Sequence, residues 1–126
     1  MLGHKALVVD DDAGIRLMLQ RVLARNQFDV EVALAGAEAL EKLLAADYDV
    51  IVLDLMMPRI TGQGVVEYLT RTRPDYIPRI VAVTAFGSRA LAEIAPPVGR
   101  VIEKPFDLNH LLREVTECAW MAGPHH

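Results

Sequence analysis

Short hydrophobic runs alternate along this chain with segments in which apolar residues recur at helical spacing. Three runs of four apolar residues, each bounded by polar or turn residues, lie at positions 6–9, 50–53 and 80–83. Uninterrupted apolarity is typical of strands in a parallel sheet that helices cover on both faces. Positions 30–34 and 101–102 are weaker strand candidates, and the alternation of 30–34 favours a place near an edge of the sheet.

The segments between these runs carry the spacing of amphipathic helices. After the first run, apolar residues fall at i, i+3, i+4, i+7 and i+8, namely Ile15, Met18, Leu19, Val22 and Leu23. Similar stripes recur at Leu40, Leu43 and Leu44, at Val65, Val66 and Leu69, and at Leu108, Leu111, Leu112, Val115 and Ala119, where Asp107 suits an N-cap. Residues 88–94 give only a short helical stretch before Pro96 and Pro97, which predicts a stunted fourth helix.

A strand followed by a helix, five times over, predicts an α/β fold with right-handed crossovers. We therefore expect a doubly wound, five-stranded parallel sheet of strand order 2-1-3-4-5, which is flavodoxin-like. The pattern fits a single domain over residues 1–122. Residues 123–126, Gly-Pro-His-His, have no core-forming pattern and are expected to be a tag or a disordered tail.

Composition narrows the function classes. The 126 residues are 52% hydrophobic and 24% charged, as in a globular domain, and the net charge of −4 without a basic cluster argues against direct nucleic-acid binding. The single cysteine, Cys118, falls in an apolar helical stripe and is expected in the core. No apolar run reaches the roughly 18 residues of a membrane span, so we expect a cytoplasmic protein that does not bind membranes.

Polar residues follow the hydrophobic runs at the ends of four predicted strands. Asp10 to Asp12 follow the first run, Asp54 the third, Thr84 the fourth and Lys104 the fifth. Ligands of doubly wound sheets bind at the carboxyl ends of the strands, where successive connections turn to opposite faces. These carboxylates, the hydroxyl and the amine are therefore expected on one rim of the sheet.

Gathered carboxylates repel one another unless a cation lies between them. An all-oxygen rim without His or Cys suits Mg²⁺, or Mn²⁺ in its place. We expect Asp11 and Asp54 as direct ligands, the backbone carbonyl of Met56 as another, and Asp10 as a ligand that acts mainly through water. A metal at this place also allows an anionic carboxylate to attack phosphorus, with Lys104 and Thr84 stabilising the transferring oxygens.

Each of these residues also has an ordinary structural interpretation. The acidic triplet is equally compatible with a helix N-cap, Asp54 before Pro58 and Gly62 with turn chemistry, and Lys104 with a surface charge. The functional interpretation rests on their conjunction, because four separate strand ends carry the groups that one reaction needs.

The set of motifs resembles the receiver domains of two-component response regulators. The resemblance lies in Val8 to Asp12, in Asp54 to Pro58 with Gly62, in Val83 to Ala85, and in Lys104 to Phe106, and it covers essentially the whole chain. It implies a signalling domain that accepts and loses a phosphoryl group rather than a turnover enzyme.

The resemblance also implies a role for each residue. Asp54 is the phosphoacceptor, Asp10 and Asp11 form the acidic pocket, Thr84 is the switch hydroxyl and Lys104 bonds the phosphoryl group. The implied donor is a sensor histidine kinase or a phosphotransfer protein, and a downstream output is implied but not identified. One departure is Val101, which occupies the position where such domains usually carry the aromatic residue of the switch.

Two other functions remain open. A phosphatase resembling the haloacid dehalogenases also uses an Asp nucleophile, but it needs a carboxylate two residues later, where this chain has Met56. The other alternative is a binding module that keeps the fold without cycling phosphate.

Overall fold

The computed structural model describes residues 4–57, 59–85 and 98–122. In this part of the chain the elements are β1 (Lys5–Val9), α1 (Ala13–Arg25), β2 (Asp29–Ala33), α2 (Gly36–Ala45), β3 (Val50–Asp54), α3 (Gly62–Thr72), the 3₁₀ helix η1 (Pro74–Arg79), β4 (Ile80–Ala85), β5 (Arg100–Lys104) and α4 (Leu108–Ala122). The expected fourth helix at 88–94 lies outside the described residues.

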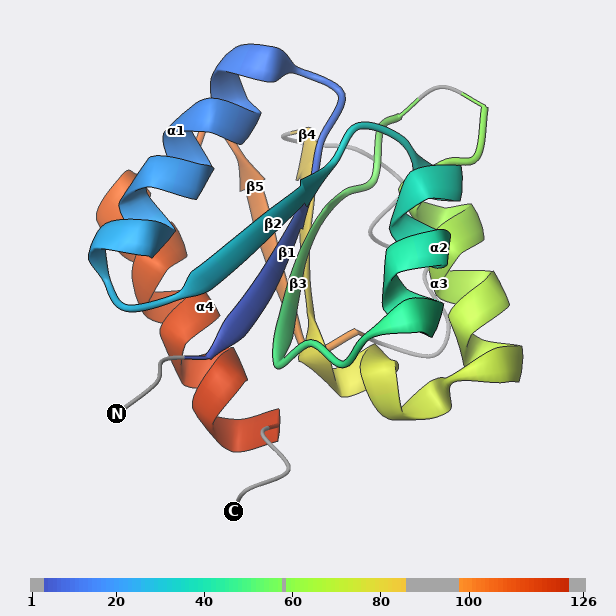
Figure 1. The fold of residues 1–126 in the computed structure, drawn as a ribbon. Coiled ribbons are helices and arrows are strands. Elements are labelled where there is room, and N and C mark those ends of the chain that lie inside the picture. The colour runs from blue at the N-terminus through green and yellow to red at the C-terminus, as the bar shows by residue number, and fades with distance from the viewer. Residues whose placement is uncertain (1–3, 58, 86–97, 123–126) are drawn as a thin grey trace.

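The five strands form one parallel sheet in the order β2-β1-β3-β4-β5. The predicted fold class and strand order are therefore confirmed. Helices α1 and α4 cover one face of the sheet, and α2 and α3 cover the other (Figure 1). The strand at 30–34 was expected near an edge, and β2 is an edge strand.

Alternating side chains of the central strands feed two cores. In β1, Leu7 and Val9 pack in the cluster that contains Leu43 of α2 and residues of α3. Ala6 and Val8 point to the other face and pack in the cluster of α1 and α4. Strands buried on both faces need apolar side chains at every position, which explains the uninterrupted runs.

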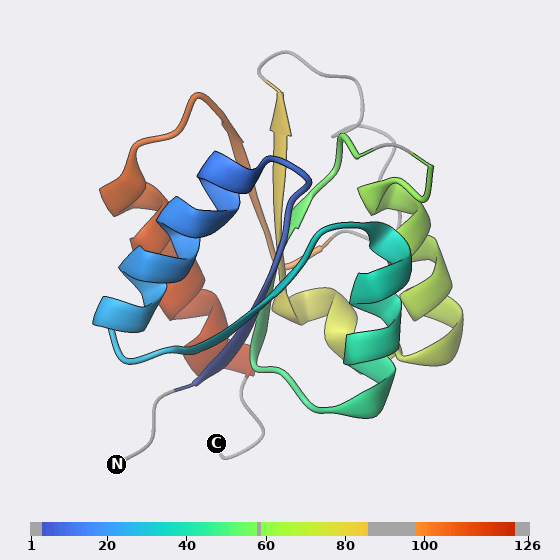
Figure 2. The same cartoon turned by 45° about the horizontal axis from the view of Figure 1, so that its top comes forward.

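The element that the sequence pattern did not predict is η1, which leads from α3 into β4 (Figure 2). Its segment contains Pro74 and Pro78 and has no amphipathic repeat, so nothing in the hydrophobic spacing marks it. It places Tyr76 and Arg79 at the amino ends of the strands, where both are buried.

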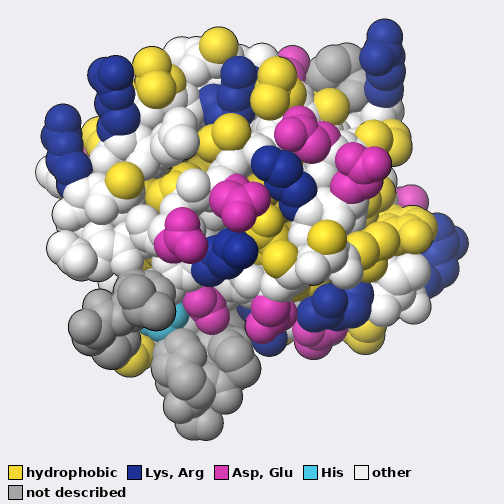
Figure 3. All heavy atoms as spheres, viewed as in Figure 1, with side chains coloured by type: hydrophobic (Ala, Val, Ile, Leu, Met, Phe, Trp, Pro, Cys, Tyr) yellow, Lys and Arg dark blue, Asp and Glu magenta, His cyan; other side chains and the backbone are white. Residues whose placement is uncertain are grey.

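Charged side chains form ion pairs along the edge strand β2. Glu31 of β2 forms ion pairs with Lys5 (3.5 Å) and Lys42 (3.9 Å), and Lys42 Nζ also donates to the carbonyl of Val32 at 2.7 Å. Acidic and basic side chains accordingly intermingle over this face of the molecule (Figure 3). Charged edges of this kind discourage strand pairing with another chain.

Within the described residues, the helices are too short or too polar to cross a bilayer.

Candidate functional site

Three carboxylates meet at the carboxyl ends of β1 and β3. Asp10 and Asp11 follow β1, Asp54 is the last residue of β3, and one oxygen of each lies within 4.8 Å of the others. Asp10 and Asp54 are each only 3% exposed, whereas Asp11 is exposed. The two strands are neighbours, and the crossover from β1 goes to one face while that from β3 goes to the other, so this is a switch point of the sheet.

Hydrogen bonds hold both the backbone and the side chain of Asp10 in place. Its amide donates to the carbonyl of Ala33 (3.2 Å), and its carboxylate accepts a bond from the amide of Asp12 (2.9 Å). Burial raises the pKa of the Asp10 carboxyl above its ordinary value, and the charges of Asp54 and Asp11 raise it further. The amide of Asp12 and the charge of Lys104 act in the opposite direction.

Asp12 does not join the cluster. It is the N-cap of α1, and its carboxylate accepts bonds from the amides of Gly14 (2.8 Å) and Ile15 (3.1 Å). The acidic triplet therefore has both of the roles that the sequence allowed. Asp12 caps the helix, whereas Asp10 and Asp11 lie close to Asp54. Asp107 has a similar capping role at α4, where it accepts a bond from the amide of Asn109 at 3.2 Å.

Lys104 provides a cation beside the buried carboxylates. Its Nζ lies 3.6 Å from Asp54 Oδ2 and 3.9 Å from Asp10 Oδ2. The side chain is partly exposed, whereas the two aspartates are nearly buried. A single amine therefore offsets part of the charge that three gathered carboxylates create.

Thr84 lies in β4, one residue beyond the partner of Asp54 in the register, since Asp54 pairs with Val83. The Thr84 side chain is fully buried, and its Oγ1 has no hydrogen-bond partner among the residues that the structure describes. A buried hydroxyl without a partner costs free energy. It is also a donor available to a group that binds at this rim.

The loop after β3 folds back onto Asp54. The amide of Met56 donates to Asp54 Oδ1 at 2.9 Å, and the amide of Leu55 donates to the carbonyl of Val83. The Met56 side chain points outward and is 55% exposed. Gly62 begins α3 directly against this turn, where an added Cβ would lie 2.6 Å from the carbonyl oxygen of Asp54.

The donor set fits a hard divalent cation. It consists of carboxylate oxygens, two of them from nearly buried side chains, without His or Cys among the clustered groups. The chemistry and the spacing of the cluster therefore fit a divalent metal ion.

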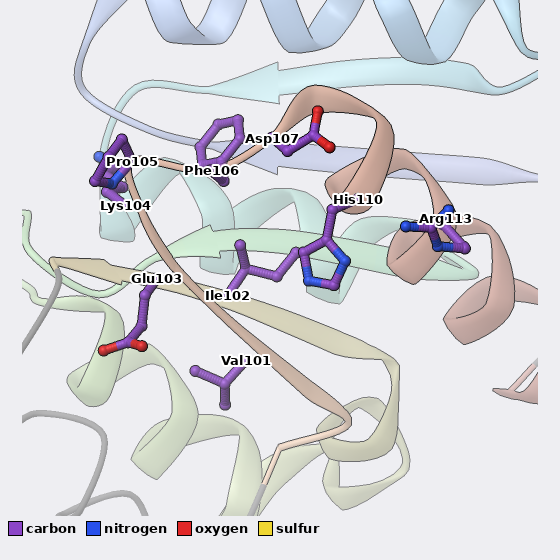
Figure 4. A pocket seen from close by; sticks show the side chains of 9 residues that line it. All are labelled: Val101, Ile102, Glu103, Lys104, Pro105, Phe106, Asp107, His110 and Arg113. Carbon is purple, nitrogen blue, oxygen red and sulfur yellow. The ribbon is translucent and has the colours of Figure 1, made fainter.

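A cleft of about 700 Å³ runs beside this site along β5 and the start of α4. It includes Lys104, but Asp10, Asp11 and Asp54 do not line it. Val101 and Glu103 point to one side of the strand, and His110 and Arg113 lie on the other side (Figure 4).

Sequence reasoning missed one residue that contacts the site. Arg16, in the first turns of α1, donates through Nη1 to the backbone carbonyl of Asp10 at 2.9 Å. The only available signal was its place six residues after Asp10, on the helix that the acidic triplet begins.

Comparison with known proteins gives one consistent result. The family model described as the response regulator receiver domain matches residues 6–116. The response regulator MprA of Mycobacterium ulcerans is 37% identical over 111 residues, and that of Mycobacterium tuberculosis is 36% identical over the same length. Each match covers 88% of this chain and 48% of the relative, so the chain spans about half the length of these curated relatives.

Solved structures agree with the fold. The receiver domain of the Francisella response regulator 1452 has a TM-score of 0.85 at 28% identity, with 94% of this chain and 98% of that chain covered. The response regulator TrrA of Thermotoga maritima, solved in complex with Mg²⁺-BeF, has a TM-score of 0.82 at 28% identity, with 92% and 99% covered. The chemotaxis protein CheY4 of Vibrio cholerae has a TM-score of 0.79 at 32% identity, with 91% and 98% covered.

Proposed function

Because this chain belongs to the receiver domain family of response regulators, we propose that it accepts a phosphoryl group on Asp54 from a sensor histidine kinase or a phosphotransfer protein. The reaction is Mg²⁺-dependent and changes the conformation of the domain. We assign the receiver domain to residues 1–122, and residues 123–126, taken from the sequence as a tag or tail, lie outside the described part.

The observation that carries the proposal is the environment of Asp54. Its carboxylate is nearly buried, lies 3.6 Å from the Lys104 amine and shares a 4.8 Å cluster with Asp10 and Asp11. A structural aspartate at the end of a strand needs neither an amine nor two further acids beside it. A phosphoacceptor needs both, since charge must be balanced before and after transfer.

In the proposed step an Asp54 oxygen attacks the phosphorus of a phosphohistidine. The new bond joins that oxygen to phosphorus, the phosphorus–nitrogen bond breaks, and the nitrogen keeps its electron pair and takes up a proton. Asp10, Asp11, Asp54 and the backbone carbonyl of Met56 would hold a divalent cation, which would supply positive charge to the phosphoryl oxygens. We base its identification as Mg²⁺ on the oxygen donors and on the Mg²⁺-BeF complex of the Thermotoga maritima relative.

The remaining groups have positioning and stabilising roles. The amide of Met56 holds one Asp54 oxygen, which orients the carboxylate toward the donor. Lys104 donates to the phosphoryl group once it is attached. The Thr84 hydroxyl, which lacks a partner in the described part of the chain, donates to another phosphoryl oxygen, and this new bond is the start of the switch.

The proposed role is that of a signalling domain rather than a turnover enzyme. Val101, at the usual aromatic position of the switch, is 37% exposed on β5, so we propose that the conformational signal does not depend on burying an aromatic ring there.

The test is labelling with acetyl phosphate and Mg²⁺ followed by intact-mass measurement. We expect the wild-type protein to gain the mass of one phosphoryl group, and the Asp54→Asn variant to gain none. Removing Mg²⁺ with a chelator is expected to slow labelling by at least about 100-fold, since charge screening of the attacking anion is lost.

Two outcomes would contradict the proposal. Stable folding without any labelling would favour the binding module that does not cycle phosphate. Repeated hydrolysis of a phosphomonoester such as p-nitrophenyl phosphate, abolished in Asp54→Asn, would favour a phosphatase.

A further inference from the structure

Arg16 makes a hydrogen bond that reaches across the loop between β1 and α1. Its Nη1 donates to the carbonyl oxygen of Asp10 at 2.9 Å, while its own amide continues α1 by donating to the carbonyl of Asp12 at 3.0 Å. We propose that Arg16 is a positioning residue, which holds the Asp10–Asp11 peptide in the orientation that metal binding requires; this inference rests on the function proposed above.

The orientation of the peptide group between Asp10 and Asp11 sets the position from which the Asp11 side chain leaves the backbone. Asp11 is the exposed member of the carboxylate cluster. A peptide group is planar, so fixing the Asp10 carbonyl also fixes the amide and the Cα of Asp11. The Asp10 amide and carboxylate are held by Ala33 and Asp12, respectively. The bond from Arg16 is the described contact that fixes the carbonyl, and through it the starting point of the Asp11 side chain.

Arg16 acts through orientation rather than through its charge. The cation that faces the carboxylates is Lys104, at 3.6 Å from Asp54 and 3.9 Å from Asp10, whereas the described bond of Arg16 goes to a carbonyl oxygen. Groups that orient metal ligands from outside the coordination shell typically change metal affinity about 10- to 100-fold when removed. Loss of the Arg16 bond is therefore expected to weaken Mg²⁺ binding without abolishing it.

The test compares Arg16→Met with Arg21→Ala in the full chain. Arg16→Met keeps an unbranched, helix-compatible stem and removes the donor, while Arg21→Ala removes the same charge from an exposed position on the same helix. Two quantities are measured for each: the Mg²⁺ concentration that half-saturates labelling by acetyl phosphate, and the Mg²⁺ concentration that half-saturates the shift of the urea midpoint.

We expect both half-saturating concentrations to rise at least about 10-fold in Arg16→Met and to stay within about 2-fold in Arg21→Ala. At saturating Mg²⁺ the labelling rate of Arg16→Met is expected to return to within about 3-fold of wild type, because the reacting groups are intact. A lower urea midpoint with unchanged Mg²⁺ dependence would show a purely structural role and overturn the inference.

The inference and the proposed function fail separately. Absence of Mg²⁺-dependent labelling in the wild-type protein would remove the proposed function. Normal wild-type labelling, with the same Mg²⁺ dependence in Arg16→Met, would remove the role of Arg16 alone. If Arg16→Met does not fold, Arg16→Lys replaces it, and an unaltered Mg²⁺ half-saturation together with loss of the Asp10 carbonyl bond in its crystal structure would overturn the inference.

Discussion

Asp10 illustrates the cost of assembling an acidic site before any cation binds. Asp10 is 3% exposed and its carboxyl group lies close to two other carboxylates, and burial is the main reason for its raised pKa. A raised pKa in the folded state means that the fold binds the proton more tightly than the unfolded chain does. The contribution of Asp10 to stability is therefore fully present below pH 3.8, its unfolded value, and is lost as the pH rises through the folded pKa.

We therefore expect Asp10→Asn to stabilise the metal-free protein at neutral pH. The amide keeps the size of the side chain and removes the buried charge, so the Tm is expected to rise by several degrees, given that about 1 kcal/mol moves the Tm of a small domain by roughly 4 °C. The advantage should shrink as the pH is lowered toward 3.8, where the wild-type carboxyl is itself protonated. Thermal unfolding followed by circular dichroism across this pH range measures both effects.

Asp29→Asn is the matched control for this measurement. Asp29 is exposed at the start of β2, so the same substitution there should leave the Tm nearly unchanged at every pH. Saturating Mg²⁺ should reverse the order of the first comparison, since it compensates the charge in the wild-type site. A metal-free Asp10→Asn protein less stable than wild type at neutral pH would show that the carboxylate is a net stabilising group.

At this scale the sequence predicts which residues gather, but not how each is used. Asp10, Asp11, Asp54 and Lys104 come together because the topology brings the ends of their strands to one rim. Asp12 has the same chemistry as its neighbours, and only the backbone direction at the start of α1 turns it into a cap. The hydrogen bond from Arg16 could not be predicted from the sequence either. Residue spacing does not distinguish a side chain that reaches back over a loop from one that points into solvent.

At the scale of elements, the junction between β3 and α3 holds the proposed phosphoacceptor. Asp54 ends the strand, and α3 begins at Gly62 so close to it that an added Cβ would lie 2.6 Å from both the Asp54 oxygen and the Leu55 Cα. The contacted atoms belong to the backbone, so they cannot move aside without shifting the loop that carries Met56. Glycine at this position therefore permits the helix to pack directly on the turn that follows Asp54.

Gly62→Ala is expected to destabilise the domain by about 1–3 kcal/mol, because overpacking against backbone atoms forces the helix and the loop apart. It should also weaken Mg²⁺ binding, since the proposed Met56 carbonyl ligand belongs to that loop. Urea unfolding without metal gives the first quantity, and the Mg²⁺ dependence of the urea midpoint gives the second.

Gly64→Ala provides the comparison within the same helix turn. Its added Cβ would come no closer than 3.5 Å to the nearest atom, so this substitution should be neutral or stabilising by up to about 1 kcal/mol through better helix propensity. Equal effects of the two substitutions would show that the close approach at Gly62 carries no constraint.

Element prediction succeeded where the hydrophobic pattern is distinctive, as an uninterrupted run or a helical stripe, and failed where the segment has neither. The central strands follow from uninterrupted apolar runs and the amphipathic helices from i, i+3, i+4 stripes, although the ends of the elements moved, as for β5, expected at 101–102 and observed at Arg100–Lys104. The 3₁₀ helix η1 follows no such pattern. Its position is fixed by tertiary contacts of Tyr76 and Arg79, which no local pattern encodes.

At the scale of the whole molecule, the two ends of the sheet have different tasks. The carboxyl ends of the strands carry the acids and the Thr84 hydroxyl, which has no hydrogen-bond partner among the described residues, and both features are unfavourable for the metal-free fold. The amino ends carry a network of satisfied groups, in which Arg79 donates to the carbonyl of Tyr48 (2.8 Å) and Tyr76 to that of Ala46 (2.8 Å). This separation allows one end to be arranged for chemistry while the other stabilises the domain.

Tyr76→Phe tests that separation. The Tyr76 hydroxyl donates to the carbonyls of Leu43 (3.1 Å) and Ala46 (2.8 Å), so its removal should lower the free energy of unfolding by about 1–3 kcal/mol. The half-saturating Mg²⁺ concentration and the labelling rate with acetyl phosphate should stay within about 2-fold of wild type, since additivity is expected for sites well apart. Tyr68→Phe, at a partly exposed position on α3, should change the stability by no more than about 0.5 kcal/mol. If Tyr76→Phe instead shifted the Mg²⁺ half-saturation several-fold under conditions where the protein stays folded, the two ends of the sheet would be coupled, and the hydrogen bonds at the amino ends would contribute to the proposed phosphoacceptor site.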